Sequence, residues 1–392
     1  MSMKLDSYGI YVHIPFCSQF CIYCDFYSVK QQSKRKAFLE SLTKEILLAG
    51  EANKIERKAE GEVNERGVGT IYFGGGTPSV LGADQLSELL HTIRTNYWSA
   101  VGGVKEITVE VNPDDVTLPY LRRLTEAGFN RLSIGVQSFD DGALKWMSRR
   151  HTGEEAAGAF YSAREAGFKN ISIDLIFGYQ MLSEGVWRDT ISKALSLSPE
   201  HISAYQMGVE RGTPLFQLAA KGEYKAPEDE IALAQYRILQ KELAATGYEQ
   251  YEVSNFSKQG YESQHNSSYW NFTPYLGFGP SAHSFYGGRR WWNYSSLNRY
   301  IKDISEGRAP YKGFEILGEK EQFGEFIMLS LRTVKGVNKR LLESNYSKFL
   351  TKAFRLSVER QKVYGNLVDD GEYIKIPSEK LFISDGIIRS IY

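Results

Sequence analysis

The 392-residue chain is poor in cysteine, has no excess of either charge and lacks long apolar runs. Its three cysteines are an odd number crowded into one segment, which excludes a disulfide framework. Lys and Arg together number 47, as do Asp and Glu, so the chain lacks the excess of positive charge that is typical of nucleic-acid-binding proteins. No apolar run approaches the roughly 18 residues that span a bilayer.

Two further absences bear on nucleotide binding and on location. The glycine-rich segment Gly74–Pro78 follows a short apolar stretch, but it has neither the Gly-x-Gly-x-x-Gly helix entry of a dinucleotide fold nor the lysine of a P-loop. The first six residues are too polar for a secretory signal. Exposed thiols and an oxygen-sensitive cluster both need a reducing compartment, so we expect the protein to be cytoplasmic.

The chain does have a C-x3-C-x2-C motif, formed by Cys17, Cys21 and Cys24. Three thiolates at this spacing can hold three corners of a cubic iron–sulfur cluster, which leaves the fourth iron open to a ligand that is not protein. A closed electron-transfer cluster takes four cysteines, and structural zinc takes four ligands. A zinc site with His13 as fourth ligand is the alternative, although His13 precedes the motif in an expected strand.

The order of apolar and amphipathic segments predicts an α/β fold. Six strand-then-helix units follow one another, which implies parallel strands with right-handed crossovers. An open doubly wound sheet and a complete or partial barrel both fit this order. Polar residues and glycines cluster at the carboxyl ends of the expected strands, where a barrel carries its functional residues. We therefore expect a partial barrel of six units. The expected strands span 8–14, 69–76, 105–111, 131–136, 171–176 and 201–206.

The alternation stops after about residue 210, so we expect three parts. Residues 1–210 form the barrel, 211–310 form an aromatic-rich linker with a loop-like stretch, and 311–392 form a small α+β domain. In the last part, short helices precede a strand pair joined by Asp-Gly, which resembles a winged helix. Such domains often bind DNA, but the charge balance argues against this, and we expect a packing or lid domain.

Single polar residues stand at the ends of successive expected strands. They are Glu110 and Asn112 at the third strand, Gln137 after the fourth, Asp174 in the fifth, and Arg149 farther along from the fourth. Each residue alone is commonplace, and a structural role is its default interpretation. Their joint placement beside the cysteine segment predicts a cofactor site at the carboxyl ends of the strands.

On these residues the chain resembles the radical S-adenosylmethionine (SAM) proteins. Among them it resembles the oxygen-independent coproporphyrinogen III oxidase family, including its haem-chaperone branch, over nearly its whole length. The resemblance implies a [4Fe-4S] cluster on Cys17, Cys21 and Cys24, with SAM chelating the fourth iron through its amino and carboxylate groups. It also implies cleavage of SAM to a 5′-deoxyadenosyl radical, with the protein supplying orientation and shielding.

The resemblance assigns the SAM contacts residue by residue. An acidic side chain can bind the SAM ammonium or ribose hydroxyls, and an arginine can meet the carboxylate as a fork. The cofactor-binding residues that it implies are Tyr11, Tyr23, Gly75, Gly76, Thr77, Glu110, Gln137, Arg149 and Asp174.

One position departs from the oxidase branch. Those enzymes carry a fourth cysteine two residues after the third, where this chain has Phe26. The departure argues against porphyrinogen decarboxylation. Because the implied SAM contacts are intact, an oxidase-type radical SAM enzyme stays the alternative to a haem chaperone.

The segment 256–294 holds 12 aromatic residues in 39 positions and two histidines, one of them in His265-Asn-Ser-Ser-Tyr-Trp270. Such a glycine-punctuated segment can form a flat apolar slot with an axial imidazole for haem iron. The alternative is that its tryptophans join two domains and both histidines are hydrogen-bonded core residues. The resemblance favours haem contact, with His265 as the first candidate ligand.

The expected partners follow from these predictions. Haem is the cargo, and the acceptor is a protein that the sequence does not identify. We expect no nucleic acid, and a transient contact with a membrane or a membrane protein stays open.

Overall fold

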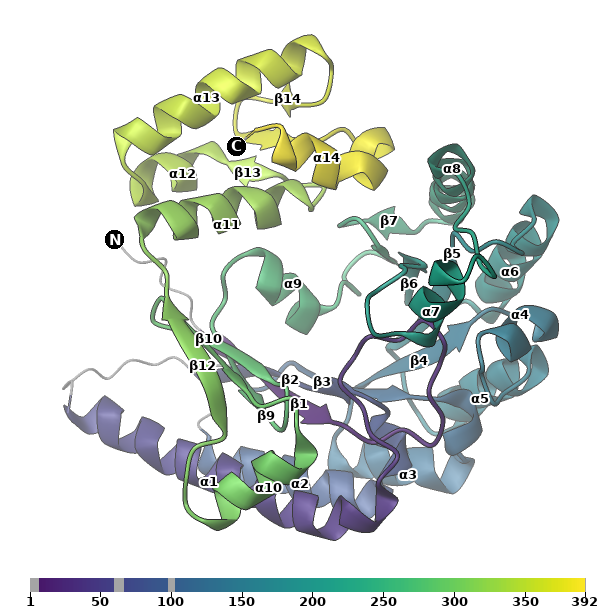
Figure 1. The fold of residues 1–392 in the computed structure, drawn as a ribbon, viewed down its shortest axis with the longest axis vertical. Coiled ribbons are helices and arrows are strands. Elements are labelled where there is room, and N and C mark those ends of the chain that lie inside the picture. The colour runs from purple at the N-terminus through teal and green to yellow at the C-terminus, as the bar shows by residue number, and fades with distance from the viewer. Residues whose placement is uncertain (1–6, 60–66, 98–102, 392) are drawn as a thin grey trace.

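The computed structural model describes residues 7–59, 67–97 and 103–391 (Figure 1). Its centre is a 12-stranded sheet whose middle consists of six parallel strands in chain order. These are β1 (Ser7–Ile14), β2 (Gly67–Gly75), β3 (Glu106–Val111), β4 (Arg131–Gln137), β5 (Ile171–Phe177) and β6 (His201–Gln206). The helices between them are α1 (Arg35–Ala59), α2 (Ala83–Asn96), α3 (Leu118–Ala127), α4 (Asp141–Trp146), α5 (Gly153–Glu165) and α6 (Glu184–Leu197).

The parallel strands form a partial barrel that does not close. Among the described residues, β1 and β6 do not pair with each other, and each pairs instead with a strand from a later part of the chain. Helices α1, α2, α3 and α5 cover the outer side of the curved sheet (Figure 1). The predicted α/β class and the partial six-unit barrel are confirmed.

Side chains along β1 alternate between two environments, the hydrophobic core under the helices and the inner face of the barrel. Ile10, Val12 and Ile14 are fully buried in the hydrophobic cluster. Tyr11 and His13 point to the opposite face, the inner face of the barrel, because successive strand residues alternate. β1 thus turns its apolar face toward the helices and its polar face toward the interior of the barrel.

Residues 211–310 add further strands to both edges of the parallel sheet. They are β7 (Glu249–Gln250), β8 (Asn255–Ser257), β9 (Tyr275–Phe278), β10 (His283–Tyr286) and β11 (Arg289–Asn293), and β12 (Tyr311–Ile316) follows. The helices of this part are α7 (Pro214–Ala220), α8 (Asp229–Ala245), α9 (Gln264–Trp270) and α10 (Leu297–Ser305). The sheet order is β12-β11-β10-β9-β1-β2-β3-β4-β5-β6-β8-β7.

The loop-like character predicted for the aromatic stretch is therefore wrong. Strand β9 has only four residues, too few for a period-2 pattern to stand out, and it pairs with β1 from the other end of the chain. The predicted boundary at residue 210 coincides with no break in the sheet, because the strands on either side of it share one sheet.

The C-terminal residues form a second, smaller unit. Its elements are α11 (Glu319–Leu331), β13 (Val337–Asn338), α12 (Lys339–Asn345), α13 (Lys348–Val363), β14 (Val368–Asp369), β15 (Tyr373–Lys375) and α14 (Ser384–Arg389). The three strands pair in the order β13-β15-β14, and the unit has its own hydrophobic cluster. The three helices before the β14–β15 hairpin agree with the order predicted from the sequence, whereas the strand β13 was not predicted.

No helix in the described parts of the chain has both the length and the hydropathy that crossing a bilayer demands. The polar start on which the prediction about a secretory signal rests, residues 1–6, lies outside the described residues.

Glu45 of α1 joins the outer helices to the sheet extension. Its carboxylate accepts hydrogen bonds from the Gly279 backbone N–H at 2.8 Å, the Asn293 side-chain amide at 2.7 Å and the Tyr300 hydroxyl at 2.6 Å. Burial raises the pKa of Glu45 to about 7, although these hydrogen bonds oppose the shift. The folded protein therefore holds a proton on Glu45 more tightly than the unfolded chain does.

We expect the stability that Glu45 contributes to be full below about pH 4.3 and to be lost as the pH rises to about 7. Urea unfolding should show that the free energy of unfolding falls between pH 5 and pH 7 in the wild type. The fall should be smaller in Glu45→Gln. Glu40→Gln, on the exposed side of the same helix, is the control and should keep the wild-type difference. Equal pH dependence in Glu45→Gln and the wild type would contradict the prediction.

Candidate functional site

The three cysteines lie on one loop that leaves the carboxyl end of β1. All three are free thiols, with Cys17 buried and Cys21 and Cys24 partly exposed. The base of the loop is closed by two backbone hydrogen bonds, from the Cys17 N–H to the Val29 carbonyl at 3.0 Å and from the Val29 N–H to the Pro15 carbonyl at 2.7 Å. The loop thus presents three sulfur ligands at the edge where a barrel carries its function.

His13 does not extend toward this loop as a fourth ligand. Its Nδ1 lies 3.1 Å from the Tyr11 hydroxyl and its Nε2 lies 2.9 Å from the Tyr27 carbonyl, so both ring nitrogens are engaged. Within residues 7–59, 67–97 and 103–391, no group of three or more His, Cys, Asp or Glu side chains is placed to hold a single metal ion. Because both of its ring nitrogens are engaged, His13 is not placed to be the fourth ligand of a zinc site.

A closed ring of contacts ties two of the cysteines to the ends of β2 and β3. The Cys17 Sγ lies 3.4 Å from the Thr77 hydroxyl, which accepts a 3.4 Å hydrogen bond from the Asn112 amide. Asn112 in turn accepts a 2.7 Å hydrogen bond from Arg149. Arg149 closes the ring through its Nη1, which lies 3.4 Å from the Cys21 Sγ. The predicted residues Thr77 and Arg149 are therefore brought to the cysteine loop.

The glycines after β2 pack against the same loop. The Gly76 N–H donates to the Ile14 carbonyl at 2.8 Å, and a Cβ on Gly76 would lie 2.8 Å from the Phe16 carbonyl oxygen. Gly75 has a φ of 114°, and a Cβ there would lie 2.6 Å from the His13 ring. Both positions require glycine because of these close approaches, whether or not a ligand also touches them.

Glu110 and Tyr11 face the interior of the barrel. The Glu110 carboxylate accepts hydrogen bonds from the Tyr72 hydroxyl at 2.7 Å and from the Gly75 N–H at 3.2 Å. Burial raises the pKa of Glu110 to about 7, and the nearby Asp174 adds to the shift. Burial also raises the pKa of the Tyr11 phenol. Glu110 can accept hydrogen bonds from a cationic or hydroxylated ligand without leaving its anchors.

Polar side chains converge at the end of β4. A Cβ on Gly135 would lie 3.1 Å from the Gln137 Nε2 and 3.2 Å from the Arg149 Nη2. Gln137 has a φ of 66°, which a residue with a side chain rarely adopts, and such strain gathers at functional sites. The Arg149 Nε is buried and has no hydrogen-bond partner in the described chain. Burial raises the pKa of the adjacent Tyr23 phenol, and Cys21 adds to this shift.

Asp174 lies on β5, on the far side of β4 from Glu110. Its carboxylate accepts hydrogen bonds from the Ser133 hydroxyl at 3.2 Å and from the Ser172 hydroxyl at 3.5 Å, and burial raises the pKa of the carboxyl group. Arg131 is buried in the same interior, only 1% exposed, and its Nε and Nη1 find no hydrogen-bond partner among the described residues. The sequence did not single out Arg131, because an arginine at a strand start usually faces solvent.

His265, the first candidate haem ligand, is fully buried. Its Nδ1 lies 2.8 Å from the Thr70 hydroxyl and its Nε2 lies 2.9 Å from the Tyr269 hydroxyl. Its ring stacks on Tyr72, with 5.2 Å between ring centroids. Both ring nitrogens are therefore satisfied inside the protein, as the core-residue alternative requires.

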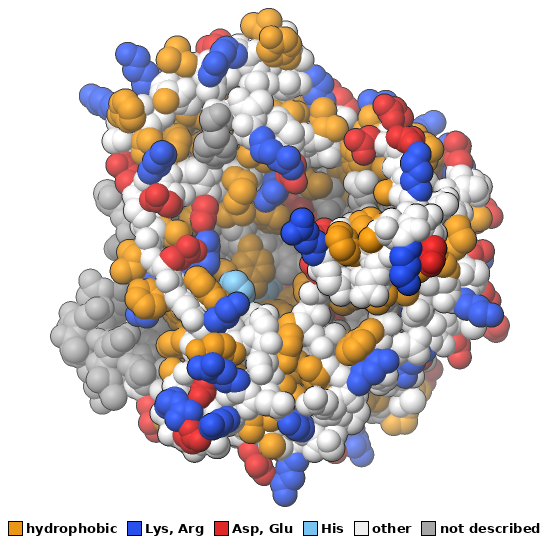
Figure 2. All heavy atoms as spheres, viewed as in Figure 1, with side chains coloured by type: hydrophobic (Ala, Val, Ile, Leu, Met, Phe, Trp, Pro, Cys, Tyr) orange, Lys and Arg blue, Asp and Glu red, His pale blue; other side chains and the backbone are white. Residues whose placement is uncertain are grey.

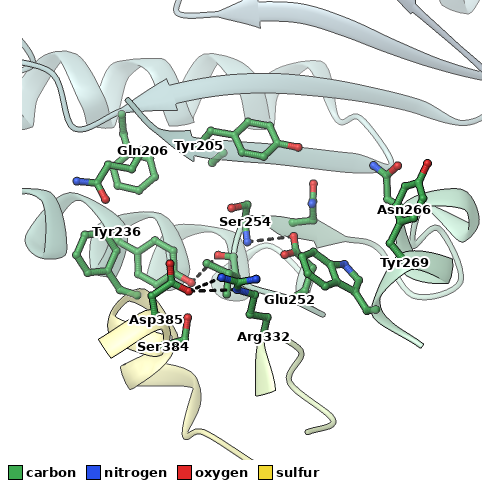
Figure 3. A pocket seen from close by; sticks show the side chains of 16 residues that line it. Tyr205, Gln206, Tyr236, Glu252, Ser254, Asn266, Tyr269, Arg332, Ser384 and Asp385 are labelled. Carbon is green, nitrogen blue, oxygen red and sulfur yellow. Dashed lines mark hydrogen bonds and ion pairs between the residues drawn. The ribbon is translucent and has the colours of Figure 1, made fainter. Parts of the chain in front are cut away.

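A cavity of about 400 Å³ lies where the end of β6 meets α8, α9 and the C-terminal unit (Figure 3). Tyr269 and Trp270 of α9 line it, together with Glu252. Arg332 and Asp385, both from the C-terminal unit, form an ion pair of 2.8 Å beside it. In the view of Figure 1, the surface of the molecule is hollowed near its centre (Figure 2).

Comparison with known proteins relates the chain to radical SAM proteins from end to end. The model of the Radical SAM superfamily matches residues 11–194. The chain is 38% identical over 346 residues to the heme chaperone HemW of Bacillus subtilis, covering 88% of each chain. It is 34% identical over 376 residues to the heme chaperone HemW of Lactococcus lactis, covering 96% of this chain and 90% of that protein.

A eukaryotic relative and a solved structure show the same similarity. The chain is 30% identical over 407 residues to the mitochondrial radical S-adenosyl methionine domain-containing protein 1 of Danio rerio, covering 100% of this chain and 89% of that one. Its fold matches coproporphyrinogen III oxidase (HemN) of Escherichia coli with a TM-score of 0.83 at 23% identity, over 99% of this chain and 91% of that one.

Proposed function

Because the chain belongs to the HemW family of radical SAM proteins, we propose that it is a haem chaperone, which binds haem and passes it to an acceptor protein. The observation that carries the proposal is the similarity along nearly the whole chain to relatives that bear this name. The match to these relatives continues past residue 194, where the radical SAM segment ends.

Cys17, Cys21 and Cys24 would hold a [4Fe-4S] cluster. The three free thiols on one loop supply three sulfur ligands, and the engaged His13 leaves the fourth iron for a ligand that is not protein. Arg149 places positive charge beside Cys21, where it would offset negative charge on a cluster held by the loop. When bound with SAM, such a cluster supplies one electron for reductive cleavage of the sulfonium.

The residues around the loop would hold SAM. Glu110 and Asp174 offer carboxylates toward the ammonium and hydroxyl groups, and Arg149 has an unpartnered Nε for a carboxylate. The backbone after β2 approaches closely because Gly75 and Gly76 carry no side chain. The full proposed set is Tyr11, Tyr23, Gly75, Gly76, Thr77, Glu110, Gln137, Arg149 and Asp174.

Phe26 favours the chaperone over the oxidase. Its side chain is 66% exposed at the position where the resembling oxidases carry a fourth cysteine. A phenyl ring there supplies no thiol, and it gives the cluster loop an apolar tip that a porphyrin face or a protein acceptor can contact.

The proposal is tested with the anaerobically reconstituted protein. Titration with haem should saturate at one haem per chain, and the loaded protein should pass its haem to apomyoglobin, a probe acceptor, on dilution. Supplied with SAM, dithionite and coproporphyrinogen III, the protein should form no protoporphyrinogen. Steady conversion of coproporphyrinogen coupled to 5′-deoxyadenosine, or failure to bind haem, would contradict the proposal.

A further inference from the structure

An axial haem ligand must be a side chain with a free donor atom at an accessible surface. All six histidines of the chain lie among the described residues, so each can be assessed. His13, His201 and His265 have both ring nitrogens hydrogen-bonded inside the protein. His151 is buried and lies 3.0 Å from the Val136 carbonyl. These four histidines are structural.

Two histidines are exposed, and they differ in their surroundings. His91 lies on α2, among the helices that cover the outside of the barrel (Figure 1). His283 is the first residue of β10, and neither of its ring nitrogens has a hydrogen bond within the described chain. The cavity beside α9 has no histidine in its lining. His283 is thus the one exposed imidazole on the sheet itself.

His283 faces the interior side of the sheet. Its neighbour two residues on, Phe285, contacts Tyr275 with ring centroids 6.4 Å apart, and Tyr275 contacts Tyr269, the partner of the interior residue His265. Residues two apart in a strand share a face. Tyr286 lies on the other face, where its ring meets the buried Tyr8.

A row of four residues across β9, β10, β11 and β12 forms a shelf around His283. Within it His283 pairs with Trp292, and Trp292 pairs with Gly313. On the other side of His283 lies Gly277, where a Cβ would come within 2.0 Å of the His283 carbonyl oxygen. A Cβ on Gly313 would likewise lie 2.9 Å from the Trp292 ring, so the two glycines allow the His283 backbone and the Trp292 indole to lie close against the sheet.

Trp292 holds the imidazole of His283 in place. The rings stack with centroids 5.9 Å apart and planes 22° apart, so both stand side by side on the sheet. A planar macrocycle can rest over the two ring edges with its metal above an imidazole nitrogen. Desolvation and the positive charge of Arg290 lower the pKa of His283, which favours the neutral form that binds iron.

The shelf adjoins the candidate SAM site. Gly277 pairs with Tyr11 across the β9–β1 ladder. Gly277 therefore lies between Tyr11 and the His283 backbone. A large planar ligand on the shelf would lie beside the cofactor site without displacing the residues that form it.

We propose that His283 is the axial ligand of the haem iron, held by Trp292 on the shelf between Gly277 and Gly313. The inference rests on the proposed haem-chaperone function and names the site at which the cargo is held. It places the ligand on β10 and leaves His265 as a structural residue of α9.

The test is a haem titration of reconstituted wild type, His283→Ala and His91→Ala, followed by Soret absorbance and low-temperature electron paramagnetic resonance. His283→Ala should raise the dissociation constant at least about tenfold and lose the imidazole-ligated signal. Free imidazole should restore that signal in His283→Ala. His91→Ala, changed at the other exposed histidine, should match the wild type.

A second variant separates ligation from folding. His283→Met should keep haem but shift its Soret band, because a thioether replaces the imidazole. If the wild type binds no haem, the proposed function fails. If the wild type binds haem and His283→Ala gives the same affinity and spectrum, the function stands and the assignment of His283 is overturned.

Discussion

Replacing Cys21 with alanine is expected to abolish assembly of the iron–sulfur cluster. The chain has only three cysteines, all on one loop, so no other thiol can take the vacant place. Two thiolates cannot hold a cube that uses three protein ligands. Iron and acid-labile sulfide in reconstituted protein should fall from about four per chain to less than one, together with the visible absorbance of the cluster.

Cys21 suits this test better than Cys17 because its side chain is only partly buried, whereas Cys17 is buried. Replacing this partly buried side chain leaves the base of the loop intact, because that base is closed by backbone hydrogen bonds of Val29. Ser18→Ala, an exposed change in the same loop, is the control and should keep the full iron content. Zinc in place of iron in the wild-type protein, or full iron in Cys21→Ala, would contradict the cluster assignment.

The sequence predicts the barrel well because its signals are local. In β1, apolar Ile10, Val12 and Ile14 alternate with residues that face the interior, and a strand prediction needs nothing more. The residues predicted for SAM follow the same logic, since the carboxyl ends of parallel strands meet at one edge. Thr77 and Arg149 do meet there, through Asn112 and the two cysteines.

What the sequence could not show depends on pairs of residues far apart in the chain. The burial of His265 follows from its bond to Thr70 of β2, and no local pattern near residue 265 reveals that partner. The face of the sheet on which His283 lies depends on the pairing of β10 with β9 and of β9 with β1. The sequence predicts an axial imidazole in this segment. The structure shows that His265 has both ring nitrogens hydrogen-bonded, whereas His283 has neither bonded among the residues that the structure describes.

The same dependence on distant partners makes Glu106 a sensitive position. Glu106, at the start of β3, is 2% exposed, and its carboxylate accepts hydrogen bonds from the backbone N–H groups of Gln264 at 2.8 Å and His265 at 2.9 Å. Its other neighbour is the buried Arg131, 4.0 Å away. One side chain thus fixes the start of α9 and compensates a buried cation.

Glu106→Ala is expected to destabilise the protein by about 3 to 5 kcal/mol, because removing one partner leaves the other charge buried and uncompensated. Urea unfolding followed by far-UV circular dichroism measures the loss. Glu184→Ala breaks an exposed ion pair with Arg188 and should cost no more than about 0.5 kcal/mol. Adding Arg131→Met to Glu106→Ala should recover part of the stability, since the orphaned charge is then gone. If the double variant is less stable than Glu106→Ala, other groups stabilise the charge of Arg131, and the loss in Glu106→Ala does not come from orphaning that charge.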